Sequence, residues 1–158
     1  GAWMITMQVS ARVDYGMRAL AELASRGPDG VATGEELADQ QGLPTKFLEG
    51  IMTQLRRAGL VVSKRGAEGG FRLGRPAEEI ALADVFRALE GPIASVRGVA
   101  PEDLAYEGAA AHLRDVWVAT RAALRSVLEN ITVADLVEGD LPKETQALLS
   151  QPGAWERR

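Results

Sequence analysis

The sequence predicts a mainly α-helical fold that contains one small β-hairpin and ends in a long helix. Three observations support this prediction. Apolar residues recur with the helical period of 3.6 in four segments before residue 92. Between Leu60 and Leu73 the period falls toward two around a glycine-rich stretch, which is typical of a hairpin. A single apolar stripe then extends from Leu113 to Ile131, which predicts a helix of about five turns.

The first helix is expected to begin after Ser10, a residue type that favours the N-cap position. It should end before Gly27 and Pro28, which interrupt helices. The inward stripe consists of Val13, Met17, Leu20, Ala21 and Ala24.

A second, shorter helix follows, and a tight turn connects it to a third. Thr33 and Glu36 have the spacing of a capping box, and Gly42 ends the second helix. Pro44 suits the first turn of the third helix, and Gly59 provides its stop. The face expected to be inward contains Phe47, Leu48, Ile51 and Leu55.

Two strand-like runs, 60–64 and 71–73, flank a long tip at residues 65–70. A fourth helix is expected to follow and to end at Gly91. The order helix, short helix, helix and basic hairpin is that of a winged helix-turn-helix domain. In such a domain the third helix enters the major groove of DNA and the hairpin contacts the backbone or a minor groove.

The chain is expected to divide into one DNA-binding domain with extensions. Its length of 158 residues is too short for two full-sized domains. The expected segments are a disordered lead-in (1–8), the winged helix-turn-helix domain (9–91), a linker loop (92–111), a dimerisation helix with a short helix after it (112–139) and a flexible tail (140–158).

The stripe of the long helix predicts a homodimer, because one small domain cannot easily bury all of it and a two-fold dimer matches the symmetry of paired DNA half-sites. The alternative is a helix that folds back only on its own domain. The residues expected at the dimer interface are Leu113, Val116, Trp117, Thr120, Leu124, Val127, Leu128 and Ile131.

The composition and motifs of the chain argue against two classes of protein, enzymes and membrane proteins. The chain has no cysteine and a single histidine, His112, and no motif that cradles phosphate or binds a metal, so we do not expect an enzyme. No apolar run approaches the roughly 18 residues of a membrane span, and we expect a cytoplasmic protein. A histidine in the position of His112 is more often a surface or interface residue than a pH sensor.

Charge is concentrated in one segment. The net charge is −4, yet residues 45–75 carry seven basic and two acidic side chains, a local charge of +5 against −9 for the rest. Such asymmetry suggests a patch that faces a polyanion, with an ordinary solvated surface as the alternative.

We expect this patch to bind double-stranded DNA. Lys46 and Glu49 lie where a recognition helix reaches base edges, although Glu49 is equally suited to a solvated surface. Arg65, at a hairpin tip, suits a narrow minor groove, and Arg56 suits either phosphate or the helix dipole. The full set of expected DNA-binding residues is Thr45, Lys46, Glu49, Arg56, Lys64, Arg65, Gly66, Gly69, Gly70 and Arg72.

Over roughly residues 7–139, the sequence resembles the Rrf2 family of bacterial winged-helix transcription regulators. The matching stretches are Val9-Ser10, Asp14-Tyr15 and Ala19-Leu20 in the first helix, Leu48-Glu49 and 55–61 across the third, Lys64-Arg65-Gly66 and Gly69-Gly70-Phe71 in the wing, then Glu90-Gly91, Trp117 and 130–136. The resemblance implies a homodimer that binds operators near promoters, usually as a repressor.

Many members of that family carry an iron–sulfur cluster on three cysteines between the fourth helix and the dimerisation helix. The corresponding stretch here, residues 97–112, contains no thiol, so a cysteine-ligated cluster is excluded and no cofactor is expected.

The sequence therefore predicts a homodimeric repressor that binds a pseudo-palindromic operator. Two alternatives stay open: a winged-helix module that binds another protein, and a regulator whose DNA binding depends on an unknown small-molecule effector between the linker and the long helix.

Overall fold

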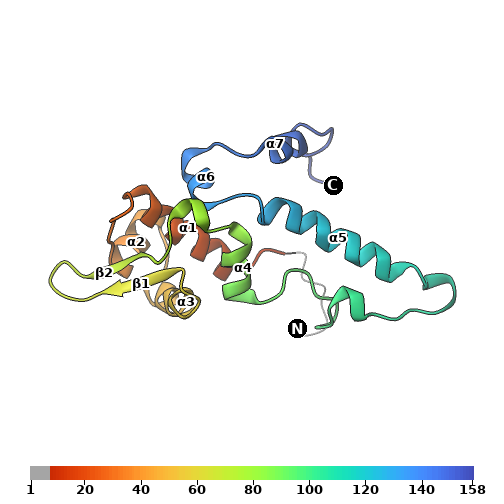
Figure 1. The fold of residues 1–158 in the computed structure, drawn as a ribbon, viewed down its shortest axis with the longest axis horizontal. Helices are drawn as coiled ribbons and strands as arrows, with labels where there is room; N and C mark the ends of the chain where they lie inside the picture. Colours follow the sequence, from red (N-terminus) through yellow and green to blue (C-terminus); the bar gives the residue numbers. More distant parts are fainter. Residues whose placement is uncertain (1–7) are drawn as a thin grey trace.

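The computed structural model describes residues 8–158, so the expected lead-in lies almost wholly outside it. The chain forms seven α-helices and one two-stranded antiparallel sheet within this range, with three short 3-10 turns (Figure 1). The helices are α1 (Ala11–Ser25), α2 (Gly34–Gln41), α3 (Thr45–Arg57), α4 (Leu82–Glu90), α5 (Leu113–Leu128), α6 (Val133–Glu138) and α7 (Lys143–Leu149). The strands are β1 (Val61–Lys64) and β2 (Gly70–Leu73), and the 3-10 turns are η1 (Ala77–Glu79), η2 (Pro101–Asp103) and η3 (Gly108–Ala110).

Helix α1 lies at the centre of the domain. The Ser10 hydroxyl accepts a hydrogen bond from the Val13 N–H at 3.2 Å, which confirms the expected N-cap. Helices α3 and α4 approach α1 at Gly16, where an added Cβ would lie 2.4 Å from Leu89 Cδ1 and 3.4 Å from Ile51 Cγ2. The core of the domain therefore depends on a small residue at this crossing.

The helix-turn-helix formed by α2 and α3 differs from the expectation in two details. Thr33 accepts from the Glu36 N–H at 3.1 Å, but the Glu36 carboxylate pairs with Arg26 at 3.1 Å, so only half of the capping box forms. Pro44 is the N-cap of α3 and precedes its first turn.

The prediction that Phe47 lies in the core is wrong. Its side chain is 40% exposed, and Met52 takes the core position beside Leu48, Ile51 and Leu55. Phe47 is in the first turn of α3, where the apolar face of the helix meets the molecular surface. Its ring instead packs edge-on against Tyr15 of α1.

The wing pairs Val61 with Leu73 and Lys64 with Gly70, which confirms the hairpin. A third segment, which the sequence pattern does not predict, joins it. Ala32, which precedes α2, exchanges two backbone hydrogen bonds with Phe71, at 3.0 and 2.7 Å. The wing is thereby attached to the segment that leads into the helix-turn-helix.

The chain returns to the core after α5. Ile131 is buried, and Leu82 and Val133 donate backbone hydrogen bonds to the carbonyl oxygens of Ile131 and Ile80, both at 2.9 Å. Thr132 caps α6 through a reciprocal pair of hydrogen bonds with Asp135. Helix α6 then packs on α1, so this short helix belongs to the winged-helix core.

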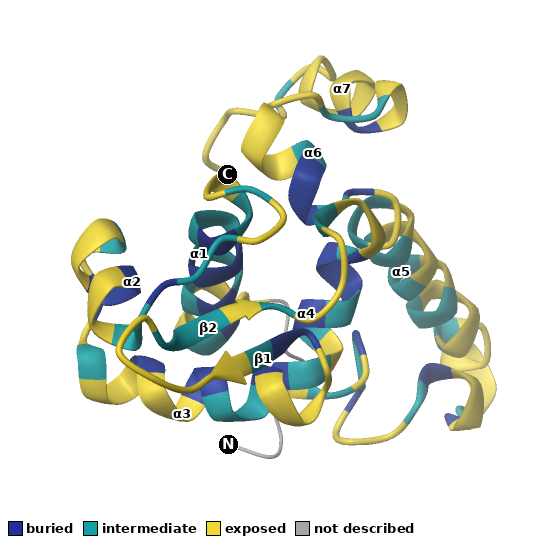
Figure 2. Ribbon diagram, turned by 60° about the vertical axis from the view of Figure 1, so that its left-hand side comes forward, coloured by how far each residue is buried: buried dark blue, intermediate teal, exposed yellow. Residues whose placement is uncertain are grey.

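Helix α5 lies at the opposite end of the molecule from the wing (Figure 1). It contains no fully buried residue, in contrast to α1, α3 and α4 (Figure 2). It packs on η2 of the linker and meets α4 only slightly. No helix within residues 8–158 is both long enough and apolar enough to span a bilayer.

The last segment differs from the flexible tail that we expected. Residues 143–149 form α7, which starts after Pro142 and buries Thr145. The Trp155 indole N–H donates to the Leu149 carbonyl at 2.8 Å and closes the end of this helix.

Candidate nucleic-acid interface

The exposed face of α3 carries a short polar row. Lys46 and Glu49 are exposed in the first two turns, and Thr45 is half-buried at the start of the helix. Gly50 and Thr53 extend the same face, and Thr53 donates its hydroxyl hydrogen to the Glu49 carbonyl at 3.0 Å. The sequence prediction did not include these last two residues, although counting in steps of three and four from Lys46 would have found them.

Gly50 is unusual because the protein does not need a glycine there. Apart from its two chain neighbours and the adjacent backbone of α3 itself, an added Cβ would meet no atom of residues 8–158 within 4 Å, yet glycine weakens a helix interior by about 1 kcal/mol relative to alanine. A glycine on an exposed helix face allows a partner to approach the backbone closely.

The wing presents Lys64, Arg65 and Arg72 to solvent. Its glycines have different roles. Gly66 has φ +109° and open space beside it, whereas a Cβ on Gly69 would lie 2.5 Å from the Lys64 carbonyl oxygen. Gly70 has φ +149°, and a Cβ there would lie 2.6 Å from the Ala32 carbonyl oxygen, so it allows the wing to pack on that segment.

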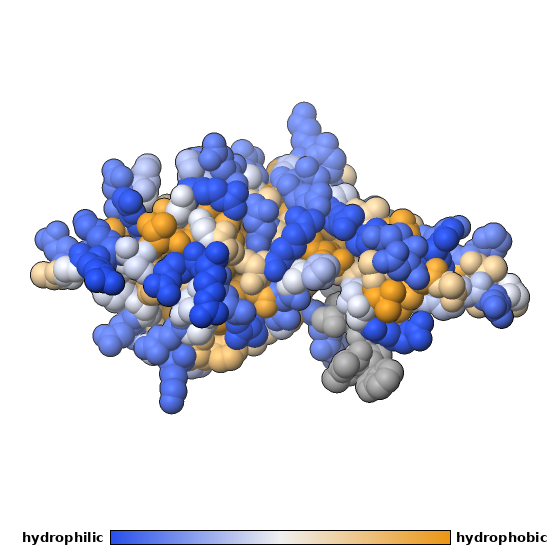
Figure 3. All heavy atoms as spheres, turned by 60° about the horizontal axis from the view of Figure 1, so that its bottom comes forward, coloured by the Kyte–Doolittle hydropathy of each residue, from blue (hydrophilic) through white to orange (hydrophobic). Residues whose placement is uncertain are grey.

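Six basic side chains of α3 and the wing make no ion pair with any carboxylate in residues 8–158: Lys46, Arg56, Arg57, Lys64, Arg65 and Arg72. Arg75, at the exit of the wing, is different, because it pairs with Asp84 at 3.7 Å. Seen from the α3 side, hydrophilic side chains cover much of the molecule around the wing (Figure 3). This surface therefore carries positive charge that the described chain does not neutralise.

The expected dimer residues divide into two groups. Val116 is 51% exposed, and Leu113, Trp117, Thr120 and Leu124 are half-buried. In contrast, Val127 and Leu128 pack partly on the domain core, and Ile131 is 6% exposed within it. The part of α5 from Leu113 to Leu124 thus keeps its apolar stripe accessible, and the C-terminal end attaches the helix to its own domain.

An ion pair joins the linker to α5. Arg121 Nη1 donates to Glu102 Oε2 at 2.5 Å, and the arginine side chain is only 13% exposed. A backbone hydrogen bond and this bond from Arg121 lower the pKa of Glu102 below its ordinary value of 4.5. Ile93, Val96 and Leu104 of the linker are buried. The linker is therefore packed in place.

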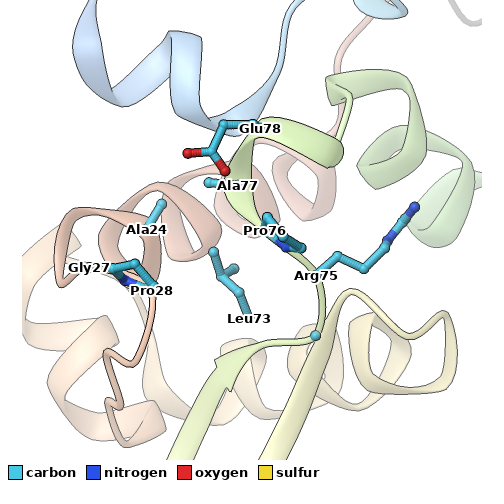
Figure 4. Close-up of a pocket in the computed structure, with 9 residues that line it drawn as sticks. Ala24, Gly27, Pro28, Leu73, Arg75, Pro76, Ala77 and Glu78 are labelled. Carbon is cyan, nitrogen blue, oxygen red and sulfur yellow. The ribbon is translucent and has the colours of Figure 1, made fainter.

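A cleft of about 360 Å³ lies between the end of α1 and the exit of the wing. Ala24, Pro28, Leu73, Pro76 and Ala77 line it, as Figure 4 shows. This is not the place between the linker and α5 where we expected an effector from the sequence. His112, at the start of α5, is 95% exposed and 3.9 Å from Asp115, which is consistent with a surface histidine.

Comparison with known proteins identifies the family. Residues 9–139 match the family model described as Rrf2, iron-dependent transcriptional regulator. A Mycobacterium tuberculosis protein assigned to the HTH-type transcriptional regulators, Rv1287, is 45% identical over 150 residues, covering 95% of this chain and 93% of the relative. The HTH-type transcriptional regulator CymR of Bacillus subtilis is 35% identical over 130 residues, covering 82% and 89%.

Solved structures of related regulators have the same fold as this chain. The structure of CymR, the global cysteine regulator of B. subtilis, aligns with a TM-score of 0.73 at 33% identity, covering 85% of this chain and 98% of that one. T. potens IscR aligns with a TM-score of 0.69 at 31% identity, covering 93% and 95%.

The iron in the family description does not fit the residues of this chain. The sequence has no cysteine, and no three histidine, aspartate or glutamate side chains within residues 8–158 lie where they could hold a metal ion together. Apart from this difference, the order of elements, the basic wing and the similarity to known regulators all agree with the family model. The chain belongs to the Rrf2 family of DNA-binding transcriptional regulators.

Proposed function

We propose that this regulator is a homodimeric repressor that binds a pseudo-palindromic operator and does so without a cysteine-ligated iron–sulfur cluster. The observation that carries the proposal is the set of six basic side chains on α3 and the wing that lack a carboxylate partner within residues 8–158. A protein surface that leaves so many neighbouring cations unneutralised suits a polyanion.

The two parts of this surface have different roles in the proposal. Helix α3 enters the major groove, where Lys46 donates to guanine or phosphate and Glu49 accepts from a cytosine amino group. Thr45 and Arg56 contact phosphates beside the groove. Direct base contacts supply specificity, and the phosphate contacts fix the position of the helix.

The wing contacts the flanking DNA. Arg65 at its tip enters a narrow minor groove, where the negative potential is strongest, and Lys64 and Arg72 contact phosphates on either side. Gly66 permits the sharp tip, while Gly69 and Gly70 fix the hairpin itself.

The dimer forms through the accessible stripe of α5. Two copies related by a two-fold axis present two recognition helices to two half-sites one or more helical turns apart. The bound dimer represses by covering the promoter against polymerase. The exposed Val116 and half-buried Trp117 are the residue types that such an interface buries.

A genome-wide selection tests this function. Purified protein is mixed with fragments of its own genome at two salt concentrations, and the bound fragments are sequenced. We expect a narrow set of palindromic sites, which Arg65→Ala loses or broadens. Arg75→Ala is the matched control, because it removes the same charge from a side chain that Asp84 already neutralises. Recovery of random fragments alone would refute sequence-specific regulation.

The wing-exit cleft favours a second candidate, in which a small molecule controls DNA binding. Ala24 belongs to α1 and Leu73 to β2, so a ligand between them would alter the angle of the wing. In that case the low-molecular-weight fraction of a cell extract would change the affinity for a selected site, and the filling variant Ala24→Phe would abolish that change.

A further inference from the structure

We propose that Arg18 is a positioning residue that holds the recognition helix α3 at the angle needed to read bases. The inference rests on the proposed DNA-binding function. Arg18 lies in α1, outside the basic segment 45–75 and outside the surface formed by α3 and the wing. It reaches the end of α2 and supports, through Tyr15, the beginning of α3.

Arg18 attaches to α2 at its last residue. Its Nε donates to Gln41 Oε1 at 3.2 Å, and its Nη2 donates to the Gln41 carbonyl oxygen. Asp14, one turn earlier in α1, accepts a further hydrogen bond from the guanidinium, from Nη1 at 3.4 Å. The Gln41 side chain also donates to Glu22 at 2.9 Å. The end of α2 is therefore clamped to α1 by a fork of donors.

The position of this clamp matters because the turn to α3 begins there. Carbonyl groups at a helix C-terminus lack partners within the helix and attract cations. The last turn of α2 contains no basic residue, so Arg18 of α1 provides the charge. Only Gly42, Leu43 and Pro44 separate Gln41 from α3. Any shift of Gln41 is thus passed to the start of the recognition helix.

A second contact holds the other side of the turn. The Arg18 guanidinium carbon lies 5.6 Å from the centre of the Tyr15 ring. That ring meets Phe47 edge-on, with 5.6 Å between ring centres and 89° between planes. Phe47 is next to Lys46, the first candidate for a base contact. This arrangement accounts for an aromatic residue whose predicted place in the core was wrong.

The consequence is specific to base recognition. Hydrogen bonds to base edges require narrow distances and angles, whereas attraction to phosphate tolerates small displacements. Loss of the clamp should therefore weaken binding to the operator far more than binding to unrelated DNA.

The test compares Arg18→Ala and Arg18→Lys with Arg26→Ala. Arg26 is the matched control, because its pair with Glu36 at 3.1 Å also joins the end of α1 to α2, but lies away from the turn and α3. The probes are a duplex recovered by the genome selection and a scrambled duplex of the same length. Affinity is measured over a range of salt concentrations, below the melting temperature of each variant.

We expect Arg18→Ala to lose about tenfold in operator affinity, the size of one lost base contact, with scrambled-duplex affinity and salt dependence unchanged. Arg18→Lys should be equally defective, because a point charge cannot replace the fork. Arg26→Ala should bind like the parent. If Arg18→Ala does not fold, Arg18→Lys and Gln41→Ala provide the same comparison.

Two results would overturn the inference while leaving the proposed function intact. If Arg18→Ala and Arg26→Ala have equal affinities for the selected duplex, Arg18 only stabilises the fold. A shallower salt dependence together with rescue by lysine would mean that Arg18 itself contacts phosphate. Failure of the parent chain to prefer the selected duplex would refute the proposed function, and the inference with it.

Discussion

Single residues on α3 show why part of the candidate DNA-binding surface could be predicted from the sequence and the rest could not. Charge identified Lys46 and the wing arginines, because cations signal a polyanion without knowledge of the fold. Gly50 and Thr53 carry no charge, and only their positions on the exposed face of the helix point to a function. Phe47 was misplaced because periodicity shows which face of a helix is apolar but not where that face leaves the core.

Gly50 allows a prediction in which stability and function change in opposite directions. Gly50→Ala should stabilise the fold by about 0.5–1 kcal/mol, because alanine favours helix and its Cβ would clash with no side chain and no other element of residues 8–158. The same methyl group should weaken operator binding by obstructing close approach. Thermal unfolding and a DNA titration on one protein sample check both effects. Unchanged DNA affinity would show that the DNA does not contact α3 at Gly50.

At the scale of elements, the four helices and the hairpin of the winged-helix domain could be predicted because each depends on local signals: caps, turns and periodicity. The pairing of Ala32 with Phe71 could not, since a single bridge between distant residues leaves no periodic pattern. The end of α5 could not be predicted either, because it too depends on a contact between residues far apart in the sequence. Its stripe continues to Ile131, but the helix ends at Leu128, because tertiary pairing with the start of α4 captures the residues that follow.

The contact between the linker and α5 predicts a pH dependence. A backbone hydrogen bond and the ion pair with Arg121 lower the pKa of Glu102 in the folded protein. The ionised carboxylate therefore stabilises the fold above the ordinary value of 4.5, and this contribution is lost as the pH falls from 4.5 through the lowered pKa. The parent should therefore melt at a higher temperature than Glu102→Gln near neutral pH, and the difference should vanish in acid. Glu107→Gln, an exposed change in the same linker, should show no such pH-dependent difference. A difference that grows in acid would contradict a stabilising role for the ionised carboxylate.

The accessible stripe of α5 predicts a weakened dimer for one substitution. Val116→Glu places a carboxylate in the proposed interface, and burying it without a partner should weaken association roughly 100-fold. The monomer should fold normally, because Val116 is 51% exposed within its own chain. Ala119→Glu, an exposed position on the same helix outside the stripe, adds the same charge and is the control. Sedimentation over a dilution series measures both. Equal association of the two variants would place the dimer interface elsewhere.

The whole molecule separates its two proposed activities in space. The wing and α3 are at one end, and α5 with its linker is at the other, so dimerisation through α5 leaves the cationic surface accessible (Figure 1). Overall charge alone would have argued against DNA, since the chain is acidic at −4. Six basic side chains of α3 and the wing that lack a carboxylate partner within residues 8–158 nevertheless favour DNA, and we expect the acidic remainder to limit indiscriminate binding.

The most direct test of specific DNA recognition is the salt dependence of affinity for a genome-selected duplex and for its scrambled counterpart. Between about 50 and about 200 mM salt, binding to both should weaken steeply, because cations on α3 and the wing replace counterions on phosphates. At every salt concentration the selected duplex should bind at least about a thousandfold more tightly. Equal affinity for the two duplexes, or binding that salt hardly affects, would contradict sequence-specific recognition by this surface.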